Sequence, residues 1–126
     1  MITPAIEQAM HQHWQQMQEE AQQLTQGGGA LSERARAASL SFLVDRSQRE
    51  LLVAASDTVF IGRCLELASG LRTNSERSIS TLKEQPREQD VRWQERLGRM
   101  QGALTALQEY EVFLIQLLSQ TRNENG

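Results

Sequence analysis

The last third of the chain carries an apolar stripe at helical spacing. From Pro86 to Gln120 there is neither a Gly-Pro break nor the alternation of a β-strand, and apolar side chains recur at steps of four and three. That repeat follows one face of an α-helix. Such a narrow, long stripe is typical of a helix that packs on another helix, in the same chain or in a second copy. The pattern predicts a C-terminal helix over about residues 87–121, whose stripe comprises Trp93, Leu97, Met100, Leu104, Leu107, Leu114 and Leu118.

The N-terminal segment predicts a second helix with clear ends. Thr3 is a suitable N-cap, and Pro4 is favoured at the first helical position. Three glycines inside a helix would cost about 1 kcal/mol each relative to alanine. We therefore expect a helix over residues 4–26, followed by a hinge at Gly27–Gly29 that allows this helix to pack on a partner chain.

The middle of the chain predicts one helix from residue 33 to about residue 56. A cap at Asp45–Ser47 would divide it, but the apolar repeat passes through this point. Residues 58–68 allow a separate helix, a continuation of the preceding one, or a short strand, because Thr58–Ile61 is β-branched and aromatic. With no second strand-like segment to pair with, the helical alternatives are favoured.

Turn signals divide the segment that follows. Ser69-Gly70 is expected to end the preceding helix as a glycine C-cap. Thr73 with Glu76 fits a capping box, in which each side chain bonds the backbone N–H of the other residue. We expect a short helix to start there and Pro86 to terminate it.

These segments predict an all-α antiparallel bundle of four to five helices, in one domain over residues 1–126. The last helix is expected to hold Glu88 and Asp90 in its first turn, where the helix dipole favours negative charge. At about 1.5 Å per residue that helix spans roughly 50 Å. The middle helix with its extension should match it, in a hairpin around a connection at residues 70–86.

Composition is that of a soluble chain. Hydrophobic residues make up 39% of the sequence, below the roughly 45–50% of globular proteins, but they are periodic rather than scattered. Residues 1–26 contain no signal-peptide core, and the apolar run at residues 110–118 is about half as long as a membrane span. The one cysteine, Cys64, cannot form an internal disulfide, which favours a reducing compartment. We expect a soluble, cytoplasmic protein.

No residue pattern indicates an enzyme, a cofactor or a metal site. His11 and His13, two apart on a helix, lie about 200° apart around its axis and cannot both bind one metal ion. Glu7 and His11 have a four-residue metal spacing, but two ligands are too few. Cys64 lies among apolar residues and should be a buried, inert thiol. A phosphate loop, a nucleophile elbow and zinc-type cysteine spacing are all missing from the sequence.

Residues 110–118 are apolar on almost every side, with only Glu111 and Gln116 polar. A helix of this kind is buried on more than one face, and we expect a second polypeptide to cover part of it. Gly98 and Gly102, four apart, would allow close approach of another helix. The expected partner interface comprises Trp93, Leu97, Met100, Leu104, Leu107, Tyr110, Phe113, Leu114, Ile115, Leu117 and Leu118.

Glu111 allows two interpretations. It is either a buried ion-pair partner that fixes helix register or oligomeric state, or a rim residue beside Tyr110 and Leu114 if a slight rotation turns those two side chains inward. We favour the second.

The expected function is that of a non-enzymatic interaction protein, a homodimer, chaperone or adaptor that buries a partner helix against its C-terminal stripe. In size, acidity and helix content the chain broadly resembles small bacterial secretion chaperones and adaptors, a likeness of class that rests on no motif. The alternative is a helical nucleic-acid-associated regulator. The intermixed charges and the net charge of −3 disfavour it, and its arginine-rich face would comprise Arg34, Arg36, Arg46 and Arg49.

Overall fold

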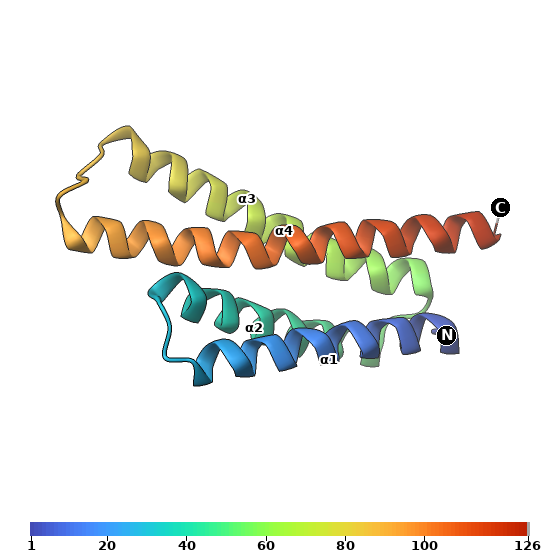
Figure 1. Cartoon of the computed structure of the whole chain (residues 1–126). Helices are drawn as coiled ribbons and strands as arrows, with labels where there is room; N and C mark the ends of the chain where they lie inside the picture. The colour runs from blue at the N-terminus through green and yellow to red at the C-terminus, as the bar shows by residue number, and fades with distance from the viewer. Residues whose placement is uncertain (126) are drawn as a thin grey trace.

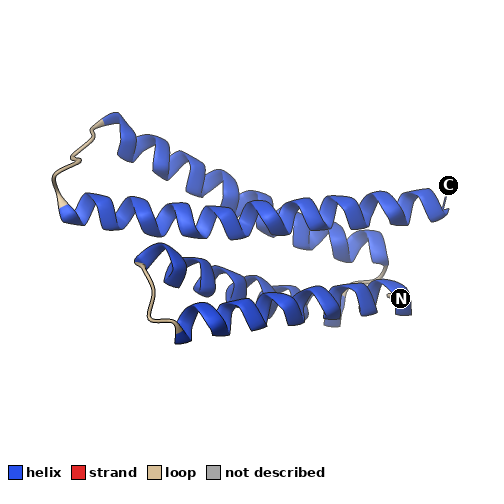
Figure 2. Cartoon of the chain, viewed as in Figure 1, coloured by secondary structure: helices blue, strands red, loops and turns tan. Residues whose placement is uncertain are grey.

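Four α-helices run alternately in opposite directions along the molecule, as Figure 1 shows. The structure, a computed structural model, describes the backbone of residues 1–125 and the side chains of residues 1–123. That part of the chain is helical apart from short connections and contains no strand (Figure 2). The predicted all-α bundle is therefore confirmed, with four helices: α1 (Pro4–Gln26), α2 (Leu31–Val53), α3 (Asp57–Glu84) and α4 (Val91–Asn125).

α1 has the predicted bounds. Thr3 precedes it in an extended conformation, but its hydroxyl donates to Asp57 Oδ2 at 2.8 Å instead of capping the helix. After Gln26 the chain reverses through a turn in which Gly28 has a φ of +60°. That left-handed conformation strains other residues but not glycine. The glycine run thus forms the tight turn that leads into α2.

α2 and α3 are separate helices. α2 ends at Val53, where the extended backbone of Ala54 breaks it, so the prediction of a helix as far as residue 56 is too long. α3 begins after Ser56, whose hydroxyl accepts the N–H of Val59 at 3.3 Å as an N-cap. The helical alternative for residues 58–68 is confirmed.

α3 continues without a break through Gly70, so the predicted C-cap at Ser69-Gly70 and the capping box at Thr73 are wrong. The Thr73 hydroxyl donates to the Ser69 carbonyl at 2.9 Å within the helix, and Glu76 pairs with Arg72 at 3.0 Å. A glycine inside a helix costs about 1 kcal/mol relative to alanine. Packing of the flanking turns against α4 offsets that cost.

α4 starts at Val91 rather than near residue 87. Residues 85–90 form the connection from α3, so Glu88 lies in this connection and not in the first helical turn. Asp90 Oδ1 accepts the N–H of Arg92 at 2.9 Å and satisfies one of the donors at the helix start. The hairpin therefore turns later than expected, and α3 is one of the helices that lie antiparallel to α4 (Figure 1).

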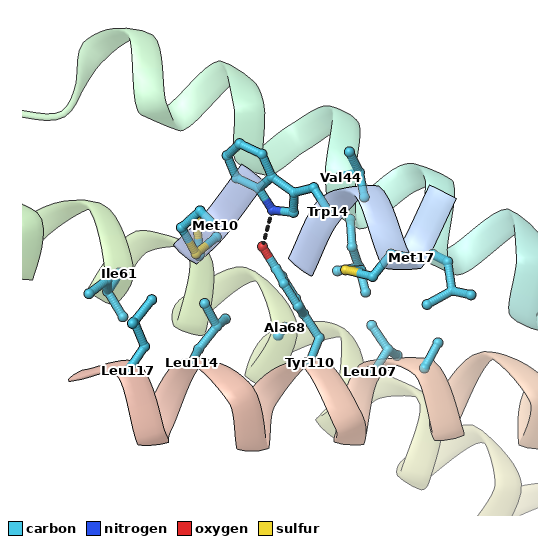
Figure 3. Packing of buried hydrophobic residues seen from close by; sticks show 14 of the residues in the cluster. Met10, Trp14, Met17, Val44, Ile61, Ala68, Leu107, Tyr110, Leu114 and Leu117 are labelled. Atoms are coloured by element: carbon cyan, nitrogen blue, oxygen red, sulfur yellow. Dashed lines mark hydrogen bonds between the residues drawn. The ribbon is translucent and has the colours of Figure 1, made fainter. Parts of the chain in front are cut away.

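Side chains from all four helices form one core. At its centre, the ring N–H of Trp14 in α1 donates to the Tyr110 hydroxyl of α4 at 3.0 Å (Figure 3). That hydroxyl donates to Ser47 Oγ of α2 at 2.7 Å, and the Cys64 thiol of α3 lies beside both hydroxyls. Because these buried polar groups bond one another, their burial avoids the cost of an unpaired group. We call these four residues the polar node.

The apolar face of α1 lies in this core. The expectation that the first helix packs on a partner chain is thereby corrected, because its stripe is covered by α2 and by side chains of α3 and α4. The buried residues of α1 are Ile6, Met10, Trp14, Met17 and Ala21.

α3 and α4 extend beyond this core as a hairpin. We call residues 76–100 the distal hairpin; its closed end lies beyond the α1–α2 turn, and α3 diverges from α4 toward it (Figure 1). Ile79, with 8% of its surface exposed, is the one buried hydrophobic residue of this segment. Leu82, Trp93 and Met100 are half-buried. Two helices alone leave part of their apolar surface open.

Candidate functional site

The residues of the predicted interface fall into three groups. The first group is buried in the core of the chain itself, where it contacts the other helices (Figure 3). These side chains are not accessible to a partner in this structure. They are Leu107, Tyr110, Leu114 and Leu117.

The second group lies at the edge of the core. The Phe113 ring stacks on the His13 ring with 3.7 Å between the centroids, and Leu118 packs partly buried against the core. Leu104 is also half-buried, whereas Ile115 has 48% of its surface exposed. The segment at residues 110–118 is thus covered mainly from within the chain.

The third group, Trp93, Leu97 and Met100, belongs to the distal hairpin. Here a groove of about 840 Å³ opens between the last turns of α3 and the first turns of α4. Its apolar floor includes Leu82, Trp93 and Met100. The Trp93 ring N–H donates to the Leu82 carbonyl at 3.1 Å and so links the two helices across the floor.

Arginines surround this floor. They come from α3, from the connection and from α4, and Asp90 and Glu95 are the two carboxylates among the lining residues. Guanidinium groups therefore outnumber carboxylates five to two around the groove, although the chain as a whole carries a net charge of −3. We call these residues the arginine rim: Arg77, Arg87, Arg92, Arg96 and Arg99.

The arginine rim differs from four arginines of the four-helix region, although Arg34, Arg46 and Arg122 of that region also form no ion pair with a described side chain. Arg36, Arg49, Arg63 and Arg72 each lie within 4.0 Å of a carboxylate oxygen. Within the described side chains, no rim arginine has such a neighbour. No ion pair with a described side chain therefore neutralises the rim arginines.

The arginine-rich face considered for nucleic acid is neutralised in part, because Arg36 and Arg49 form ion pairs with described side chains whereas Arg34 and Arg46 do not. Arg36 bonds Glu20 of α1 and Glu109 of α4. Arg49 pairs with Asp45 at 3.2 Å, while the guanidinium of Arg46 lies 5.8 Å from the centre of the Phe42 ring. A guanidinium that already bonds carboxylates has fewer donors left for phosphate oxygens.

Glu111 lies at the rim of the core and also forms an ion pair. Its Oε2 accepts from Arg72 Nε at 2.8 Å and from the Ser69 hydroxyl at 2.6 Å, which joins α4 to α3. Tyr110 and Leu114 point inward, as the favoured interpretation required. Burial raises the pKa of Glu111, but the hydrogen bonds from Arg72 and Ser69 outweigh it, so the pKa lies below its ordinary value.

The two glycines of α4 have different surroundings. A Cβ at Gly102 would lie 2.0 Å from the carbonyl oxygen of Ser32, so glycine is what allows the start of α2 to approach α4. A Cβ at Gly98 would meet no atom within 4 Å. Close helix approach is confirmed at Gly102 and not at Gly98.

The histidines and the cysteine do not assemble into a reactive site. His11 is exposed and His13 half-buried, and burial lowers the pKa of His13. Cys64 is buried, which raises the pKa of its thiol to about 11 and keeps it protonated at neutral pH. Across the described residues, no three His, Cys, Asp or Glu side chains are placed to hold a metal ion.

Comparisons with protein-family models, curated proteins and solved structures found no match to this chain. None of the helices in the described residues combines the length and hydrophobicity that a membrane span requires.

The arginine rim is the feature that the sequence analysis missed. Its signal was present, because Arg92, Arg96 and Arg99 repeat at steps of four and three. Averaging charge over whole segments concealed it, since the helices that carry the rim also carry glutamates.

Proposed function

We propose that the protein is a non-enzymatic interaction protein that binds a helix of a partner protein in the groove of the distal hairpin. The observation that supports this is the half-buried floor of Leu82, Trp93 and Met100, which two helices enclose where four helices enclose the core. An amphipathic helix laid into such a groove would complete the packing. A chaperone or adaptor role fits this mode of binding, and the unpaired Cys64 is consistent with the reducing cytoplasm.

The energetics show what such binding requires. Covering ~400 Å² of apolar surface at about 25 cal/mol per Å² gives a gross gain of about 10 kcal/mol. Association costs roughly 4–15 kcal/mol in lost translational and rotational freedom. Apolar contact alone therefore leaves little net affinity, and directional polar contacts must supply both affinity and specificity.

Comparative capture tests the proposal. The full chain, a Trp93→Ala/Met100→Ala variant and a Val112→Ala/Ile115→Ala control are used to capture partners from the native cell lysate. The control removes apolar side chains that are 55% and 48% exposed on α4 but lie away from the groove. We expect the groove variant to lose its partner while the control keeps it.

Two further measurements complete the test. Circular dichroism verifies that both variants keep their helices, and light scattering gives the mass of each protein alone. Equal capture by the two variants would contradict the proposal. If the natural chain forms a dimer that the groove variant does not form, the occupant of the groove would be a second copy of the chain and not a different protein.

A further inference from the structure

Three rim arginines form a row on α4. Arg92, Arg96 and Arg99 are spaced by four and three residues, which places them on one face of the helix. With a rise of about 1.5 Å per residue the row is roughly 10 Å long, or two helical turns. Arg77 and Arg87 extend the positive charge to α3 and to the connection.

No ion pair with a described side chain neutralises this row. Glu95 lies four residues before Arg99, a spacing that often gives an ion pair in a helix, yet their charged groups are not within 4.0 Å of each other. The same spacing does give ion pairs between Asp45 and Arg49 and between Arg72 and Glu76. Arg92 and Arg96, four apart, are like charges that weaken an isolated helix. An anionic ligand bound to the row would relieve this repulsion.

The floor of the groove selects the type of anion. A ligand that reaches the arginine row also covers Trp93 and Met100, so it needs an apolar face beside its negative charges. Nucleic acid would offer phosphates but little that packs on Met100 and Leu82. An amphipathic helix whose carboxylates repeat at steps of three and four matches the spacing of the arginine row when it lies parallel or antiparallel to α4. The planar guanidinium group bonds carboxylates in a bidentate manner.

The most acidic helix of a second copy is not free to be this ligand. α1 is the helix with acidic side chains and no arginine or lysine, and it carries Glu7, Glu19 and Glu20. Its apolar face, however, is buried in the core. The folded α1 of a second copy therefore does not offer both an acidic and an apolar face, which favours another protein as the source of the occupant.

We propose that the groove binds an acidic amphipathic helix of a partner protein, with carboxylates on Arg92, Arg96 and Arg99 and apolar side chains on Trp93 and Met100. This inference rests on the proposed function, because it names the chemistry of the helix that occupies the same groove.

Three labelled helical peptides with one shared apolar face test this inference. Their polar positions at steps of three and four carry Glu, Gln or Lys, and binding to the full chain is followed by fluorescence anisotropy. The Glu peptide should bind about tenfold more tightly than the Gln peptide, and the Lys peptide should bind most weakly. The advantage of the Glu peptide should shrink as salt rises from about 50 to about 500 mM, because salt screens exposed charges.

Charge reversal in the chain provides the matched controls. Arg92→Glu/Arg96→Glu/Arg99→Glu should weaken binding of the Glu peptide by about tenfold or more and should improve binding of the Lys peptide. The control Arg34→Glu/Arg46→Glu/Arg122→Glu changes the net charge equally at positions that do not line the groove. It should leave both affinities within about twofold, because none of these three side chains lines the groove.

The remaining outcomes separate the two proposals. Equal binding of all three peptides overturns the acidic partner and leaves helix binding in place. Binding of none of them overturns both. Tighter binding of a single-stranded or duplex DNA oligonucleotide than of the Glu peptide, in the same buffer, overturns both in favour of nucleic acid.

Discussion

The two ends of the α3–α4 pair differ in what surrounds them. At the core end, α1 and α2 complete the packing, so Tyr110 and Leu114 lie at no more than 1% exposure. At the distal end no other helix of the described chain covers the pair (Figure 1), and Trp93 and Met100 remain half-buried. The same two helices thus form part of a closed core at one end and an open groove at the other.

Charge follows the same division. Around the core, Arg36 joins α2 to Glu20 and Glu109, and Arg72 joins α3 to Glu111. Around the groove, the arginine rim has no such partner among the described side chains. Ion pairs join helices where the fold is closed, whereas the five arginines around the open groove form none with the described side chains.

The largest expected difference between the two ends comes from one substitution made at each. Trp14→Ala removes a side chain that is 1% exposed, and it should destabilise the chain by about 4 kcal/mol. Trp93→Ala removes a half-buried ring and should cost about 1–2 kcal/mol. Urea unfolding followed by circular dichroism measures both. Similar losses of unfolding free energy would show that side chains in the distal hairpin are packed as tightly as those in the core.

The glycine pair sharpens the boundary between the two regions. Gly102→Ala forces a methyl group against the Ser32 carbonyl and should destabilise by about 2–3 kcal/mol. Gly98→Ala meets open space in the distal hairpin and should stabilise by up to about 1 kcal/mol through helix propensity. Thermal unfolding of the two variants should give shifts of opposite sign. Shifts of the same sign would place the limit of tight packing elsewhere on α4.

The polar node gives an intermediate effect. Tyr110→Phe leaves the ring N–H of Trp14 and the hydroxyl of Ser47 without their partner, at a cost of about 1–2 kcal/mol. Because the residues contact one another, adding Ser47→Ala should cost less than the sum of the two single changes. Denaturant midpoints of the single and double variants measure this coupling. Strict additivity would show that the node does not act as a unit.

The smallest expected effect is the pH dependence contributed by Glu111. Its pKa is lower in the folded chain than in the unfolded one, so its contribution is present above the unfolded pKa of about 4.3 and is lost as pH falls through the folded pKa. Glu111→Gln should therefore flatten the stability profile below about pH 4.3. Unfolding midpoints from neutral to acid pH compare the two proteins. Parallel profiles would show that the ion pair between Arg72 and Glu111 does not contribute to the stability of the folded chain.

The helices could be predicted where strong local signals coincide with packing. Pro4 and the run from Gly27 mark both ends of α1, and the structure has the same bounds. At Gly70 the local signal for a helix end was present but α3 continues, because contacts with α4 on both sides outweigh the propensity of one glycine. Propensity is local, whereas this contact depends on residues far away in the chain.

The candidate site was predicted in part. The stripe containing Trp93 and Met100 was recognised, but periodicity alone cannot tell which part of it the chain covers itself. Tyr110 and Trp93 both belong to the predicted interface, and the packing of α1 and α2 beside α4 makes Tyr110 buried while Trp93 stays half-buried. The groove could not be predicted, because it depends on the divergence of α3 from α4 (Figure 1), and no sequence signal in either helix indicates this divergence.

The polar node also has a consequence for how the chain can be divided. The polar node comprises one residue from each helix: Trp14, Ser47, Cys64 and Tyr110. A fragment that lacks one helix would therefore expose the remaining node residues to solvent or leave them without a hydrogen-bond partner. Cutting the chain at Gly28, or deleting its first helix, would not leave a smaller version of the same protein. We therefore expect the four helices to fold cooperatively, since the core joins side chains of the first and the last helix.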